Sequence, residues 1–193
     1  MKLVHVPKLF RELHGESATP FEIALTYVGA VLITAALAIF DRHFFLTRHA
    51  GEMVVLIVVS LDLSGGIIAL RSPGTAEYYF RRPKNAWVFL ALHVAQPALL
   101  LIPATDFWIF LVFLAAYTLP SSAVVMLLRR RLPAEAAERV APPVALLLVV
   151  VGGIIATAGY HVPGYLAALA VIYMLKLIYA FAASPAAGRQ SRP

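Results

Sequence analysis

Three ionisable side chains lie inside long apolar stretches of the sequence, where charged residues are rare. They are the carboxylate Asp62, the imidazole His93 and the ammonium Lys176. A charged group near the centre of a bilayer costs roughly 2.5–3.5 kcal/mol on insertion scales unless it is paired or hydrated. These residues therefore predict either a binding or transport site or a buried ion pair that fixes helix packing. For a functional site, Asp62 and His93 are the natural proton-handling pair, because carboxylates and imidazoles form proton relays in pumps and transporters.

The composition explains why such residues would lie in a membrane. Hydrophobic residues make up 61% of the 193 residues and charged residues 13%, against about 45–50% and about 25% in soluble domains. We expect an all-α, polytopic integral membrane protein that forms one domain over 1–193, with six transmembrane helices and short loops. The apolar stretches predict spans at about 20–40, 51–70, 86–102, 107–128, 143–159 and 164–183, with a short polar tail at 184–193.

The N-terminal segment, 1–18, has a different pattern. Apolar residues recur at helical spacing between Leu3 and Leu13, with Lys8 and Arg11 among them, and this predicts an interfacial helix on the membrane surface. The segment lacks the apolar core and cleavage site of a secretory signal, so we expect it to stay in the protein. Thr19, Pro20 and Glu22 then predict a capped helix start for the first span.

Lysine and arginine predict the orientation. Thirteen of them fall in the termini and in the loops after spans two and four, and only Arg42 and Arg48 fall in the opposite loops. This bias places the basic side in the cytoplasm and is consistent only with an even number of spans. We therefore expect a protein of the cytoplasmic (inner) membrane with both termini in the cytoplasm.

The orientation also predicts that the three ionisable residues share one depth. Counted at about 1.5 Å per residue from the cytoplasmic ends of their spans, Asp62, His93 and Lys176 lie roughly 12–14 Å above that boundary. Gln96, Ser64 and Tyr173 fall near the same level. Pro120 removes a helical hydrogen bond, and it predicts a kink in the fourth span. The sequence thus predicts a polar layer in the cytoplasmic half of the bilayer, which could hold a solute or a proton.

The loop 71–84 combines a Pro-Gly turn, three successive aromatic residues and four cations. One interpretation is recognition of an anion or a lipid headgroup by Arg81, Arg82, Lys84 and Thr75. The other is an aromatic and basic anchor that contacts anionic lipids and sets the topology.

Several classes of chemistry have no motif in this sequence. Without cysteine there are no disulfides, thiolate metal sites or cysteine nucleophiles. We find no nucleotide-binding or nucleophile-elbow motif and no metal motif, and we expect no cofactor and no nucleic acid. The pentapeptide GGIIA occurs at 65–69 and again at 152–156, from either an inverted repeat or simple small-residue packing.

Three functions follow from these patterns. The leading hypothesis is a small permease or carrier whose polar layer binds a solute and handles protons. The second is a non-enzymatic scaffold or accessory subunit, in which the layer holds helices together and the protein forms a homo-oligomer or meets a membrane partner. The third is an enzyme that acts on a lipid headgroup at the cytoplasmic face. No catalytic residue is assigned.

Overall fold

The computed structural model describes residues 3–80 and 83–183. Within these residues, five helical segments are long and apolar enough to cross a membrane. They are α2 (Pro20–Phe40), α4 (Ala50–Leu70), α8 (Trp108–Arg131) preceded by the 3-10 turn η2 (Thr105–Phe107), α9 (Ala134–Gly159), and α10 (Gly164–Met174) continued by the π-helical turn η3 (Leu175–Phe181). The short helix α3 (Arg42–Leu46) joins α2 to α4. The prediction of a helical protein with several membrane-length apolar helices is confirmed.

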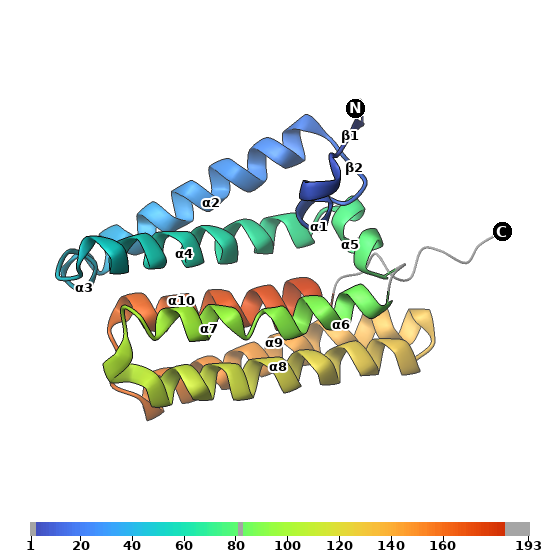
Figure 1. Ribbon diagram of the computed structural model, residues 1–193. Coiled ribbons are helices and arrows are strands. Elements are labelled where there is room, and N and C mark those ends of the chain that lie inside the picture. Colours follow the sequence, from blue (N-terminus) through green and yellow to red (C-terminus); the bar gives the residue numbers. More distant parts are fainter. Residues whose placement is uncertain (1–2, 81–82, 184–193) are drawn as a thin grey trace.

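The helices form two layers (Figure 1). Helix α2 packs along α4 in one layer, and α8, α9 and α10 with η3 form the main part of the other. Large apolar side chains on the outer surface of α2 are exposed, including Leu32 at 63% and Ile39 at 75%. A surface of this kind suits contact with lipid chains rather than water.

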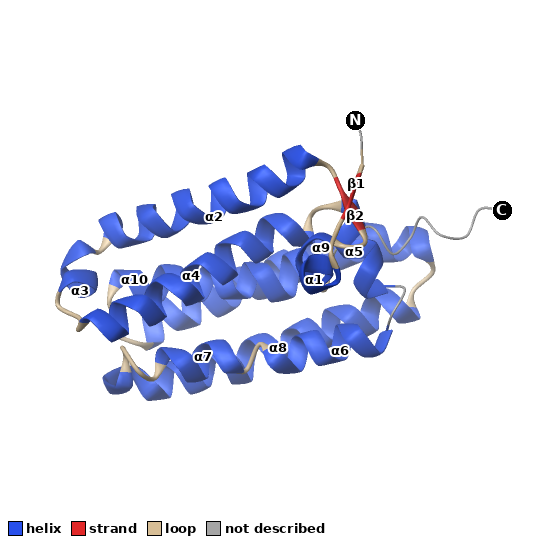
Figure 2. Ribbon diagram, turned by 45° about the horizontal axis from the view of Figure 1, so that its top comes forward, coloured by secondary structure: helices blue, strands red, loops and turns tan. Residues whose placement is uncertain are grey.

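The predicted third span, 86–102, is not one continuous helix. It consists of α6 (Pro83–Leu92) and α7 (Ala95–Leu100), which lie along one line with a turn between them (Figure 2). Pro97 has no N–H to donate to the carbonyl of His93, four residues earlier. The Tyr173 hydroxyl donates to that carbonyl instead, at 2.9 Å. The predicted third span is therefore interrupted, and five continuous helices within residues 3–80 and 83–183 are long and apolar enough to cross a membrane, so the predicted count of six is not confirmed.

The predicted N-terminal interfacial helix is not confirmed either. The segment forms a two-stranded antiparallel pair, β1 (Val4–His5) with β2 (Ser17–Ala18), which encloses the 3-10 turn η1 (Lys8–Phe10) and the single helical turn α1 (Arg11–His14). Gly15 ends α1 with φ of 74°, a conformation that glycine adopts without strain. A side chain there would also collide with Gly74, because a Cβ would lie 2.2 Å from its carbonyl oxygen. The turn thus lets the segment dock against the residues after α4.

Two further boundaries differ from the predicted ones. The segment 71–84, expected as a loop, contains α5 (Pro73–Phe80). Ser72 accepts a hydrogen bond from the Thr75 N–H at 3.4 Å, and a serine cap followed by proline is a common helix start. Helix α9 starts at Ala134 rather than at 143 and continues through Pro142 and Pro143. By contrast, the capping box at Thr19 and Glu22 is present as predicted.

One end of the molecule carries the parts that matter for the site. The end of α4, α5, the N-terminal segment, the end of η3 and the α8–α9 connection all lie there (Figure 1). Arg71, Arg130 and Arg131 are at this end, and we call it the basic end.

Candidate functional site

An ion pair joins the two layers near the basic end. The Lys176 ammonium lies 2.8 Å from Oδ2 of Asp62 and donates a second bond to the Asp62 carbonyl at 3.2 Å. The two side chains differ in exposure, since 3% of the Lys176 side chain but 51% of the Asp62 side chain is accessible. The lysine is therefore enclosed by protein, whereas the carboxylate faces open space.

Local backbone features make this contact possible. Lys176 belongs to η3, a π-helical turn of the kind that often occurs at functional sites. Gly66, one turn after Asp62, leaves room for the lysine, because a Cβ at Gly66 would lie 2.3 Å from Lys176 Cε and 2.8 Å from Nζ. The irregular turn and the glycine together let the ammonium reach α4.

Gln96 contributes from the third predicted span. Its side-chain amide donates to the same Asp62 oxygen that binds Lys176. The other carboxylate oxygen, Oδ1, has no hydrogen-bond partner among the residues described. The Gln96 side-chain oxygen is likewise buried without a partner in the described part of the chain.

His93 lies at the break between α6 and α7. Its Nδ1 is 2.6 Å from the carbonyl oxygen of Phe89, and because a carbonyl only accepts, Nδ1 carries the proton. In the neutral ring Nε2 is then an acceptor, and within 3–80 and 83–183 it has no partner. The residue is only 8% exposed, and its ring packs on Phe89 with the centroids 4.1 Å apart. An acceptor buried without a partner costs free energy unless water or a ligand satisfies it.

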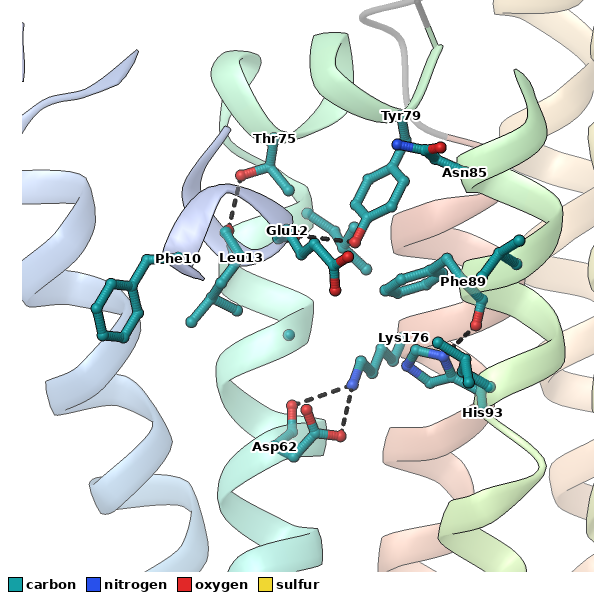
Figure 3. A pocket seen from close by; sticks show the side chains of 15 residues that line it. Phe10, Glu12, Leu13, Asp62, Thr75, Tyr79, Asn85, Phe89, His93 and Lys176 are labelled. Atoms are coloured by element: carbon teal, nitrogen blue, oxygen red, sulfur yellow. Dashed lines mark hydrogen bonds and ion pairs between the residues drawn. The ribbon is translucent and has the colours of Figure 1, made fainter. Parts of the chain in front are cut away.

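These residues border a cavity of about 420 Å³ between α4, α6, η3 and the N-terminal segment (Figure 3). Asp62, His93 and Lys176 lie in its wall, together with polar residues from α1, α5 and α6 and with apolar side chains. The remaining lining residues are Phe10, Glu12, Leu13, Gly66, Ala69, Leu70, Thr75, Tyr79, Asn85, Val88, Phe89 and Leu92. Val88 and Leu92 are 57% and 63% exposed, so the cavity is open to the outside along the α6 side.

Glu12 is the residue of this site that the sequence did not indicate. Its side chain points into the cavity between Tyr79 and Phe89 (Figure 3). The Tyr79 hydroxyl donates to the Glu12 carbonyl at 3.0 Å, and burial raises the pKa of Tyr79 well above its usual range, with Glu12 adding to the rise, so the hydroxyl keeps its proton. The Glu12 carboxylate itself has no ion-pair or hydrogen-bond partner within the described residues. Because α1 was predicted to lie on the membrane surface, no pattern in the sequence pointed to this docking.

Other predicted residues lie elsewhere or have structural partners. Thr75 lines the cavity, and its hydroxyl donates to the Leu13 carbonyl at 2.8 Å, so it ties the N-terminal segment to α5. Ser64 is buried outside the cavity lining, and Tyr173 is tied to the His93 carbonyl. Lys84 is exposed on α6, while Arg81 and Arg82 lie outside the described residues.

Helix α8 continues through Pro120, and the kink predicted there stays a prediction. No cluster of three or more metal-ligating residues occurs in the segments 3–80 and 83–183.

The two GGIIA segments play different parts. A Cβ on Gly65 would lie 3.3 Å from the Cβ of Ala30 in α2, whereas one on Gly152 would lie 2.3 Å from the Tyr117 ring in α8. Gly66 gives space to Lys176, but Gly153 meets only Val171 at an ordinary 3.8 Å. Both segments serve close helix packing, and only the first serves the ion pair.

Comparison of the chain with protein-family models, with curated proteins and with solved structures gave no match. The class that the described residues define is a helical protein with five apolar, membrane-length helices among them and a cavity with charged groups in its wall near the basic end.

Proposed function

We propose that this chain is a small membrane carrier whose cavity at the basic end binds a solute beside Asp62. The observation that supports this proposal most directly is the difference in exposure between the two side chains of the ion pair. A pair that only joins helices is best enclosed on both sides, because water weakens it. Here Lys176 is enclosed and the Asp62 carboxylate is half exposed on a cavity of about 420 Å³, which suits a site that a solute reaches.

The two irregular helices support this proposal. In many transporters the substrate binds where transmembrane helices are discontinuous, since the freed backbone groups and the bend serve binding and movement. In this chain the α6–α7 break at His93 and the π-turn η3 at Lys176 lie on the same cavity. They are the natural places for the helices to bend when access changes.

The proposal includes six crossings in the cytoplasmic membrane, with the basic end in the cytoplasm. From Pro83 to Leu100, α6 and α7 together would reach about 27 Å at 1.5 Å per residue, close to the thickness of a bilayer core of about 30 Å. The thirteen basic residues of the termini and of the loops after spans two and four favour this orientation, and Arg71, Arg130 and Arg131 would contact anionic lipids there.

The test is uptake into proteoliposomes that contain the full chain. Labelled methylammonium, alanine, succinate and glucose are offered with and without a pH gradient, and uptake is normalised to folded protein. We expect one of these solutes to accumulate above the level in empty liposomes, and this uptake should be lost in the double variant D62N/K176M. That variant removes both charges at once, so it leaves no unpaired ion behind.

The scaffold hypothesis predicts a different result for uptake. If the pair only holds helices together, the folded double variant supports the same flux as the original protein. Equal uptake by the original chain and by D62N/K176M would therefore contradict the carrier proposal.

A second candidate is an enzyme that acts on a lipid headgroup, and the exposed apolar rim formed by Val88 and Leu92 favours it. A headgroup could pass this rim from the bilayer to His93 or Asp62. Thin-layer chromatography of vesicles of phosphatidylethanolamine and phosphatidylglycerol, incubated with the protein, tests this candidate. A new lipid product that H93Q fails to form would support it, and unchanged lipids would exclude these two as its substrates.

A further inference from the structure

We propose that the cavity binds a primary ammonium group carried on an apolar body. This inference rests on the proposed function and names the class of ligand for the same site. It differs from recognition of an anion, which is one of the two interpretations of the basic loop 71–84.

The charges on the cavity wall favour a cation. Lys176 and Asp62 compensate one another at 2.8 Å. Glu12 adds a second carboxylate, whose oxygens have no partner in the part of the chain that the structure describes. A monovalent cation between Glu12 and Asp62 would complete the balance of charge, whereas an anion would face two carboxylates with one ammonium already engaged.

The hydrogen-bonding groups that remain free at the site favour a donor. Oδ1 of Asp62, Nε2 of His93 and the Glu12 carboxylate are all acceptors without a partner among the described residues, and His93 is 8% exposed. The hydroxyl donors of the wall are already engaged, because Thr75 donates to the backbone carbonyl of Leu13 and Tyr79 donates to the backbone carbonyl of Glu12. Asn85 is the wall residue that can offer both a donor and an acceptor. The three N–H groups of a primary ammonium can serve acceptors on this wall, whereas a quaternary ammonium or an anion offers them no donor.

The rest of the wall favours an apolar body. Phe10, Phe89 and Leu92 line the cavity, and Phe89 presents its ring beside His93 (Figure 3). Aromatic faces attract cations, and apolar side chains take hydrocarbon. Such a ligand is either a free amphiphilic amine or the ammonium of an aminophospholipid, which could pass the exposed rim at Val88 and Leu92.

Binding to the full chain in phosphatidylcholine nanodiscs tests this inference. The probes are 2-phenylethylammonium, its N,N,N-trimethyl derivative and the matched anion 3-phenylpropionate. The binding of each probe is measured by isothermal titration calorimetry. We expect saturable binding of the primary ammonium, no binding of the carboxylate, and about tenfold weaker binding of the trimethyl derivative, a factor that corresponds to ~1.4 kcal/mol. Preferred binding of 3-phenylpropionate would overturn the proposal.

The variant E12Q tests the role of the second carboxylate. Its side chain makes no bond within residues 3–80 and 83–183, so we expect the variant to fold, with the affinity for 2-phenylethylammonium reduced about tenfold. E135Q removes the same charge from an exposed position at the start of α9, outside the cavity lining, and should bind as the original chain does. Equal affinity of E12Q and E135Q would contradict the assignment.

Replacing phosphatidylcholine by phosphatidylethanolamine separates the two sources of the ammonium. If the lipid headgroup occupies the cavity, the apparent affinity for 2-phenylethylammonium falls in the ethanolamine lipid, and if a free amine is the ligand, it does not. Both outcomes support the ammonium site. Binding of the amine without uptake of any solute would contradict the carrier proposal but support the ammonium site. Uptake of succinate or glucose without amine binding would support the carrier proposal and contradict the ammonium site.

Discussion

Two aspartates, Asp41 at the end of the bundle opposite to the cavity and Asp62 on the cavity wall, show how differently the same residue type is used. Asp41 lies at the end opposite to the cavity, between α2 and α3, and both of its carboxylate oxygens accept backbone hydrogen bonds. The Phe44 N–H donates to one at 3.2 Å and the Tyr165 N–H at the start of α10 donates to the other at 3.1 Å. Asp62 instead binds Lys176 and Gln96 through one oxygen and leaves the other free within the described residues.

The groups around the two aspartates show the same contrast in hydrogen bonding. Tyr165, whose N–H binds Asp41, also pairs through its hydroxyl with Ser60 of α4 at 2.7 Å, and Phe44 and Tyr165 are 5% and 0% exposed, so these groups complete a packed junction between α3, α4 and α10. Beside Asp62, Nε2 of His93 and the carboxylate of Glu12 have no partner among the described residues and border a cavity. At the first end the hydrogen-bonded groups stabilise the fold, and the guanidinium of Arg48, whose buried Nε has no hydrogen-bond partner among the described residues, lies over the Phe44 ring. At the second end the acceptors on the cavity wall have unused capacity for a ligand.

The single variant D62N should have the largest effect on stability. It leaves the Lys176 ammonium, 3% exposed, without its counter-charge. We expect a loss of about 3 kcal/mol, the lower end of the range for breaking a buried pair, because the Asp62 side of the pair is already half exposed. Equilibrium unfolding in mixed micelles measures the loss. D62N/K176M should recover most of it, and a double variant as unstable as D62N would contradict the pairing.

The variant D41A should cost less stability and leave the cavity intact. Removing a cap that serves two backbone N–H groups should lower the free energy of unfolding by about 1–2 kcal/mol. Uptake and amine binding, normalised to folded protein, should equal those of the original chain. If D41A impaired binding as strongly as E12Q, the division between a structural end and a binding end would fail.

The second glycines of the two GGIIA segments offer a matched pair. G66A places a methyl group where Lys176 lies, and we expect a loss of about 1 kcal/mol through overpacking, with weaker amine binding because the lysine must shift. G153A meets only an ordinary contact with Val171, and it should be neutral or stabilise by up to about 1 kcal/mol, since alanine favours helix over glycine. The same unfolding and calorimetric measurements apply. Identical behaviour of both variants would show that Gly66 has no special relation to the ion pair.

The smallest effect concerns the N-terminal segment that covers the cavity. Burial lowers the pKa of His14 below its ordinary value of 6.5, against an opposing effect of Glu22, and the ring contacts the Tyr27 hydroxyl at 3.4 Å. The unfolded segment therefore takes up a proton before the folded one as the pH falls, so stability is present above pH 6.5 and is lost below it. Hydrogen exchange of residues 11–18 at about pH 7.5 and about pH 5.5 should show faster opening at the lower pH. H14Q should remove this difference, and a pH dependence that persists in H14Q would assign it to another group.

The sequence predicted much of the fold because hydropathy and capping act locally. The apolar stretches at 20–40 and 51–70 match α2 and α4 closely, and the Thr19 capping box starts α2 as expected. The break at His93 was missed although Pro97 stands in the sequence, because proline interrupts only some membrane helices, depending on the neighbours that satisfy the freed carbonyl. Here that neighbour is Tyr173, 80 residues away.

The sequence identifies those residues of the site whose position follows from their depth along a predicted span. Counting residues from the span ends put Asp62, His93 and Lys176 at one level, and the structure joins Asp62 with Lys176 and Gln96 and sets His93 on the same cavity. Glu12 could not be found in this way. Its place depends on the turn at Gly15 and on the bonds of Thr75 and Tyr79, which are contacts between distant parts of the chain.

The most direct test of the central claim is the reactivity of a single cysteine at Asn85, because the chain has no cysteine of its own. Asn85 is partly exposed and lines the cavity (Figure 3), whereas the control Ala156 is fully buried in α9 away from it. The probes are cationic and anionic methanethiosulfonates, with rates normalised to a free thiol. We expect N85C to react, faster with the cationic reagent, and A156C to stay unmodified. An N85C thiol as inert as A156C, or one that reacts faster with the anionic reagent, would show that no hydrated, cation-attracting cavity leads to Asp62, and the account would be wrong.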